Sequence, residues 1–86
     1  MLGMKEALIP MSHVYVPISK KAGYDEKASE EIANQILEEG LLMPIEVRLD
    51  HAKKRYVLVN GLKRLEAYRM LGETEIRAVF VEARQH

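Results

Sequence analysis

The side chains best suited to chemistry follow an apolar stretch at residues 56–59. Asn60 and Gly61 end that stretch and open a loop that runs through Leu62 to Lys63 and Arg64. A glycine between a strand and a helix leaves the first backbone N–H groups of the helix unpaired, and the helix dipole adds partial positive charge there. The two cations add full charges, and a guanidinium can bind phosphate through paired hydrogen bonds. The pattern favours a phosphate-binding turn, and an ordinary turn with two solvated cations is the alternative.

Other reactive groups are scarce in this sequence. It contains no cysteine, which excludes disulfides, thiolate zinc sites and cysteine nucleophiles within these residues. The histidines, His13, His51 and His86, fall in separate predicted elements without metal-ligand spacing. We therefore expect no metal site.

The charge is unevenly distributed although the net charge is zero. Residues 1–50 hold five Lys/Arg against nine Asp/Glu, and residues 51–86 hold eight against four. The basic half could face a polyanion, and its candidate cations for a nucleic-acid backbone are Lys53, Lys54, Arg55, Lys63 and Arg64. Zero net charge argues against strong non-specific binding to duplex DNA, because such binding depends on neutralising phosphates.

Four strands are predicted from alternating or continuous apolar residues, at residues 13–18, 45–49, 55–59 and 76–81. The second and third of these would form a hairpin around a polar turn. Residues 19–24 are expected to form a polar loop.

Two helices are predicted between these strands. The first spans residues 25–39, with Asp25 as its N-cap and Gly40 ending it as a left-handed cap. The second spans residues 62–71, with Gly72 as its cap. The inward face of the first helix would carry Ala28, Ile32, Ala33, Ile36 and Leu37.

The length of the chain fits one domain. We assign residues 1–12 to an N-terminal extension and residues 13–86 to the domain. No apolar run reaches the roughly 18 residues that a membrane span needs, and the start is too short, and too acidic at Glu6, for a secretory signal. We therefore expect a cytoplasmic protein.

Two stretches of the sequence resemble the ParB/sulfiredoxin-like domain family. Residues 40–48, GLLMPIEVR, are similar to its G-L-x-x-P-I-x-V-R segment. Residues 61–67, GLKRLEA, with the later Leu71-Gly72 and Ile76-Arg77-Ala78, are similar to its G-x-x-R-x-x-A … L-G … I-x-A segment. The resemblance covers roughly residues 13–81. It implies an α+β fold with a small mixed sheet and two main helices.

The resemblance also implies nucleotide binding at the glycine turn. Members of the family hold the phosphates of CTP, ATP or ADP there, with or without Mg²⁺. Gly61 and the amides of Leu62 and Lys63 would meet phosphate oxygens, and Arg64 would pair with the same phosphates. Two residues outside the turn are implied as well, Pro44 beside the base or sugar and Gln35 as a hydrogen-bonding group for phosphate or ribose.

Departures from the family pattern bear on the reaction. Sulfiredoxins need a cysteine just after the glycine, where this chain has Leu62, so sulfinic-acid repair by that route is not expected. Relatives often carry histidine or arginine at the next position, which is Lys63 here. Glu39 matches the place where free-serine kinases are thought to keep a catalytic glutamate, and a solvated helix end is the alternative for it.

Three functions therefore stay open. A nucleotide-binding module needs the fewest further groups and ranks first. A phosphotransferase using Glu39, or a nuclease using Mg²⁺, is the enzymatic alternative. A DNA-partition or DNA-binding accessory protein is the third, because chromosome- and plasmid-partition proteins belong to the family. Its partners would be DNA or another protein, and the oligomeric state is open.

Overall fold

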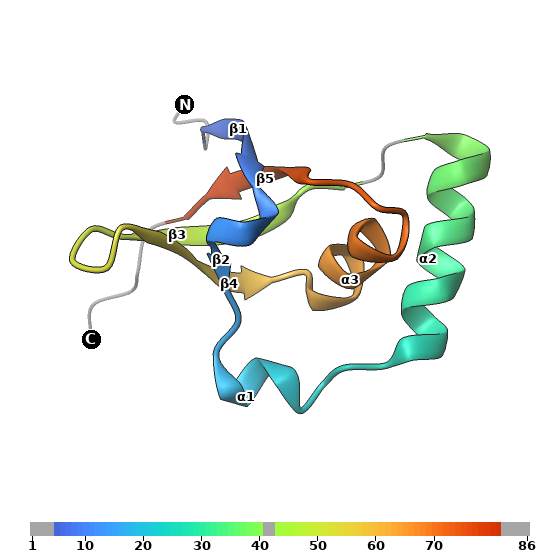
Figure 1. Cartoon of the computed structure of the whole chain (residues 1–86), viewed down its shortest axis with the longest axis horizontal. Helices are drawn as coiled ribbons and strands as arrows, with labels where there is room; N and C mark the ends of the chain where they lie inside the picture. Colours follow the sequence, from blue (N-terminus) through green and yellow to red (C-terminus); the bar gives the residue numbers. More distant parts are fainter. Residues whose placement is uncertain (1–4, 41–42, 82–86) are drawn as a thin grey trace.

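A five-stranded mixed sheet runs through the molecule (Figure 1). The computed structural model describes residues 5–40 and 43–81. The strands are β1 (Glu6–Pro10), β2 (Val14–Tyr15), β3 (Ile45–Asp50), β4 (Arg55–Asn60) and β5 (Glu75–Phe80). The helices are the 3-10 helix η1 (Met11–His13) and the α-helices α1 (Ile18–Lys21), α2 (Glu26–Glu39) and α3 (Leu62–Met70).

The order across the sheet is β1-β5-β3-β4-β2. β3 and β5 lie parallel in the middle, while β3 and β4 form the predicted antiparallel hairpin. β1 pairs antiparallel with β5 at one edge, and β2 pairs parallel with β4 at the other. The predicted α+β fold with a small mixed sheet and two main helices is confirmed.

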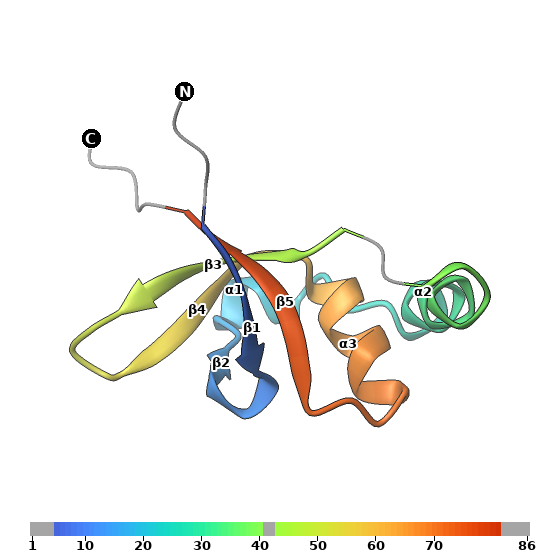
Figure 2. The same ribbon diagram turned by 90° about the horizontal axis from the view of Figure 1, so that it is seen from above.

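The core lies between the sheet and α3, with α2 packed outside α3 (Figure 1, Figure 2). Figure 2 shows α3 between α2 and the strands. Because neighbouring side chains of a strand point to opposite faces, every second residue of the central strands joins this core. The buried cluster consists of Ile9, Met11, Ile45, Val47, Leu58, Leu65, Tyr68, Ile76 and Ala78.

Helix α2 begins and ends at the residues that the sequence predicts. An oxygen of the Asp25 side chain accepts a hydrogen bond from the Ala28 amide at 3.1 Å, which satisfies one unpaired donor of the first turn. Gly40 ends the helix at φ 88° and ψ −160°, so the helix stops at the expected glycine, but this glycine does not adopt the left-handed helical conformation that was expected. The buried face is rotated from the expected one, because Ser29 and Ala33 are buried whereas Leu37 is 71% exposed.

The N-terminal boundary differs from the expected one. Residues 6–11, which the sequence analysis assigned to an extension, contribute strand β1 and two core residues, Ile9 and Met11. β1 is short and ends at Pro10, so its alternation is hard to recognise without its partner β5. The described part of this segment therefore belongs to the domain.

The segment after β2 also differs from expectation. The predicted strand at residues 13–18 is reduced to Val14–Tyr15, because Pro17 has no N–H to extend the ladder. The carbonyl of Pro17 instead accepts the amides of Lys20 and Lys21, which begins helix α1 inside the expected loop. None of the helices in the described ranges is long and apolar enough to cross a membrane.

Candidate functional site

Gly61 lies where β4 passes directly into α3. Its φ is 113°, a value that residues other than glycine rarely adopt. A Cβ at this position would lie 2.8 Å from Cγ2 of Ile45 and 3.2 Å from its Cα. Packing against β3 therefore requires glycine here, independently of any ligand.

The first turn of α3 carries unpaired backbone donors. The first intrahelical bond runs from the Leu65 amide to the Gly61 carbonyl at 2.9 Å, and no side chain caps this helix. The amides of Leu62, Lys63 and Arg64 therefore have no intrahelical acceptor. The start of α2, by contrast, is capped by a carboxylate. The start of α3 is thus the one of these two that is open to an anion.

A cavity of about 310 Å³ adjoins this helix start. It is lined by Lys20, Gly23, Ile32, Asn60, Gly61, Leu62, Lys63 and Arg64. These residues come from α1, the loop after it, α2 and the β4–α3 turn. Among the described residues, three cations and no acidic side chain line it, so the site favours a negatively charged ligand.

Arg64 has a structural contact in addition to its place at the cavity. Its Nη1 donates to the carbonyl oxygen of Pro44 at 2.7 Å, in a partly buried position. This bond ties the start of α3 to the segment just before β3. A guanidinium has five N–H donors, so this contact leaves others that could meet a ligand.

The other predicted site residues lie outside the cavity lining. Gln35 and Glu39 are exposed on α2, and Pro44 reaches the site only through its bond to Arg64. Glu39 is the last residue of α2, about 10 Å along the helix axis from Ile32, which lines the cavity. The connector residues Leu41 and Leu42, and His86, lie outside the described residues.

Three lining residues were not predicted as site residues, Lys20, Gly23 and Ile32, and of these Ile32 was expected only on the inward face of the first helix. Asn60, which also lines the cavity, belongs to the predicted loop. The basic pair Lys20-Lys21 followed by Gly23 was the available signal, because two cations in a loop can approach an anion. The sequence does not show, however, that α1 lies beside the start of α3.

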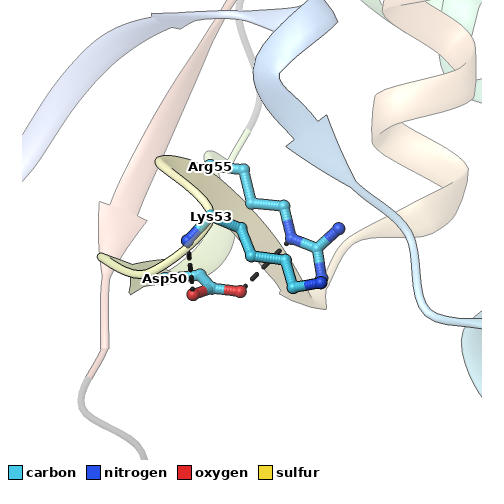
Figure 3. Close-up of polar contacts among 3 residues, drawn as sticks. All are labelled: Asp50, Lys53 and Arg55. Carbon is cyan, nitrogen blue, oxygen red and sulfur yellow. Dashed lines mark hydrogen bonds and ion pairs between the residues drawn. The ribbon is translucent and has the colours of Figure 1, made fainter.

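The cations of the β3–β4 hairpin are arranged differently (Figure 3). Asp50 accepts the amide of Lys53 at 3.2 Å and Nε of Arg55 at 3.3 Å, and the Arg55 guanidinium lies 3.8 Å from the ring centre of Tyr15. The Lys53 amide, and then Arg55, hold the pKa of Asp50 below its usual value, although burial acts in the opposite direction. Arg55 is thus held by contacts within the domain.

The turn of this hairpin, which carries Lys53 and Lys54, is also far from the cavity. It precedes the start of β4, whereas Gly61 follows the end of β4, and a strand of this length spans about 20 Å. The cations grouped in the sequence analysis, Lys53, Lys54, Arg55, Lys63 and Arg64, therefore do not form one surface. No group of three His, Asp or Glu side chains within residues 5–40 and 43–81 could hold a metal ion.

Solved structures share this arrangement of strands and helices. A sulfiredoxin from Arabidopsis thaliana superposes with a TM-score of 0.77 at 24% identity, covering 92% of this chain and 86% of that one. The C-terminally truncated chromosome-partitioning protein ParB from Caulobacter crescentus, complexed with CTP-γ-S, gives 0.77 at 24% identity over 94% of this chain and 46% of that one. A free serine kinase in complex with AMP gives 0.75 at 15% identity over 92% and 32%. At these identities the likeness shows the fold.

Sequence comparison gives relatives of higher identity than these structures. It is 36% identical over 66 residues to a probable chromosome-partitioning protein ParB of Campylobacter jejuni, covering 77% of this chain, and 40% identical over 55 residues to that of Neisseria meningitidis, covering 64%. The matches span 23% and 19% of the length of those relatives. The pattern of the family described as the ParB N-terminal domain matches residues 4–86. The chain belongs to the ParB N-terminal domain family.

Proposed function

We propose that this domain binds a nucleotide, with its phosphates at the start of α3. The observation that carries this proposal is a cavity that is lined by Lys20 and Lys63 and lies at the uncapped amides of α3. Amide donors at a helix start and mobile cations around it are the usual partners of phosphate oxygens in proteins.

Each lining group has a role in this proposal. The amides of Leu62 and Lys63 would donate to phosphate oxygens, while Lys20 from α1 and Lys63 from α3 would neutralise their charge. Arg64 would use its remaining N–H groups on the same phosphates while it holds the carbonyl of Pro44. Because Pro44 precedes β3 directly, this bond would set the wall of the site beside the sugar or base.

The related structures support a nucleotide over a simple phosphate. One relative of this fold was solved with CTP-γ-S and another with AMP. We therefore propose CTP, ATP or ADP as ligands. Mg²⁺, if present, would be held mainly by the phosphates, since no carboxylate among the described residues lines the cavity.

The enzymatic and DNA-related roles are separate proposals. Glu39 stays a prediction as a catalytic group, although it lies outside the cavity lining. The named relatives are chromosome-partitioning proteins much longer than this chain. A part in DNA partition is therefore proposed for a whole protein of that kind, with this domain as its nucleotide-binding unit.

Calorimetric titration with CTP, ATP and ADP, each with and without Mg²⁺, tests the proposal. The informative variant is Lys63→Ala, because Lys63 is exposed at the cavity and its loss should leave the fold intact. Hydrogen bonds to charged groups are worth about 1.5–3 kcal/mol, so we expect the affinity to fall about tenfold or more.

Lys53→Ala is the matched control. Its side chain is also exposed, but it lies on the hairpin at the other end of β4, so its removal should leave affinity unchanged. Equal losses in both variants would point to general electrostatic attraction, and a wild-type protein that binds none of the nucleotides would refute the proposal.

A further inference from the structure

Lys20 brings a cation to the cavity from outside the β4–α3 turn. It lies on α1, which connects β2 with the loop before α2 (Figure 1). The Lys20 amide donates to the Pro17 carbonyl at 2.9 Å, and the Lys20 carbonyl accepts the Gly23 amide at 3.0 Å. Both backbone groups of Lys20 are therefore bonded within this short segment, which fixes the point from which its side chain reaches the cavity.

The cations at the cavity are not neutralised by the described part of the protein. The three ion pairs within residues 5–40 and 43–81 join other side chains, and none of them includes Lys20, Lys63 or Arg64. Lys20 and Lys63 are also exposed. Their ammonium groups are therefore available to a ligand.

Gly23 leaves space beside Lys20. Unlike Gly61, it does not have a positive φ. A Cβ at Gly23 would meet only the carbonyl oxygen of Lys20, at 3.5 Å, which is an ordinary contact. Neither the backbone conformation nor the packing requires glycine at this position. What the missing side chain provides is an open wall of the cavity next to Lys20.

The positive charge at the cavity exceeds the charge of one phosphate. A phosphate monoester carries about −1.5 to −2 at neutral pH. Lys63 and Arg64 supply two positive charges at the start of α3, and the helix dipole adds about half a charge. A single phosphate at this place would already be neutralised, so the charge of Lys20 is matched only if the ligand carries a further phosphate.

We propose that Lys20 is a specificity-determining residue, which selects nucleoside di- and triphosphates over monophosphates by binding a phosphate beyond the first; this inference rests on the nucleotide site proposed above. The phosphate nearest the sugar would lie at the amides of Leu62 and Lys63, because Arg64 links this end of the site to Pro44 and so to the wall proposed for the sugar. The following phosphates would extend across the cavity to the ammonium group of Lys20.

Calorimetric titration with AMP, ADP and ATP, and with the corresponding cytidine nucleotides, tests this role. Mg²⁺ is left out, so that it does not bind the same phosphates. We expect Lys20→Ala to lower the affinity for the di- and triphosphates about tenfold or more, and the affinity for the monophosphates by less than about twofold. Lys21→Ala is the matched control, because Lys21 is the next exposed lysine of α1 but does not line the cavity. Its affinities for all six nucleotides should stay within about twofold of wild type.

Phosphorus NMR spectra of the saturated ADP complex give a second readout, which does not depend on measuring weak binding of a monophosphate. Replacing Lys20 by alanine should move the resonance of the β-phosphate more than that of the α-phosphate. Equal losses of affinity for mono- and diphosphates would reduce Lys20 to a source of general attraction and overturn the inference, as would wild-type affinity of Lys20→Ala for ADP and ATP. Those results would leave the nucleotide site standing, whereas a wild-type protein that binds none of these nucleotides would refute the site itself.

Discussion

Replacing Gly61 by alanine should destabilise the domain more than replacing any glycine whose surroundings are open. A Cβ there would lie 2.8 Å from Cγ2 of Ile45, closer than real Cβ contacts, and 3.2 Å from the backbone of β3. Relieving this contact by shifting packed groups costs about 1–3 kcal/mol. The positive φ adds about 1–2 kcal/mol for an L residue. We therefore expect Gly61→Ala to cost roughly 2–5 kcal/mol.

Gly72→Ala separates these two costs. Gly72 also has a positive φ, of 78°, but a Cβ there would meet nothing within 4 Å. Urea unfolding of both variants should show the larger loss for Gly61→Ala. Its melting temperature should fall by about 10 °C or more, since 1 kcal/mol shifts a domain of this size by about 4–8 °C.

A double variant locates the contact. In an Ile45→Ala background, Gly61→Ala should cost less than it does in the wild type, because Cγ2 is gone. The relief should be partial, since the Cα of Ile45 remains in place. If Gly61→Ala proved no more destabilising than Gly72→Ala, the claim that packing against β3 requires this glycine would be refuted.

Three further changes test other contacts. Arg64→Ala should lower the free energy of unfolding in urea by about 1–2 kcal/mol, because it removes the charged hydrogen bond to the Pro44 carbonyl. It should also weaken nucleotide binding. An unchanged stability would argue against this hydrogen bond. The pKa of Asp50 is lowered in the folded state, so its carboxylate should stabilise the protein above the unfolded pKa of about 3.9. This contribution should vanish as pH falls through the folded pKa. The difference in unfolding free energy between wild type and Asp50→Asn should therefore be present at neutral pH and disappear in acid. Tyr68→Phe should leave the melting temperature unchanged or raise it, since the buried hydroxyl has no hydrogen-bond partner in the described structure; a marked fall would show that the hydroxyl does have one.

Local patterns were reliable where a residue acts on its own neighbours in sequence. Asp25 caps α2 and Gly40 ends it as predicted, because both effects depend on the backbone within one helical turn. The β3–β4 hairpin and the turn from Asn60 into α3 were likewise predictable from alternation and a glycine. Strand β1 was not recognised, because a short segment ending in proline becomes a strand only through its pairing with β5.

For the candidate site, too, local features were predictable from the sequence and contacts between distant segments were not. The sequence predicted the turn from Gly61 to Arg64, since glycine, helix start and cations are consecutive there. It could not predict that Gly61 is required by Ile45, or that Arg64 bonds to Pro44, because these contacts join segments far apart along the chain. Lys20 reaches the cavity from α1, while Lys53 and Arg55 lie at the opposite end of β4. The reason is physical: local sequence specifies backbone conformation, whereas the assembly of a charged cavity depends on how distant elements pack against one sheet.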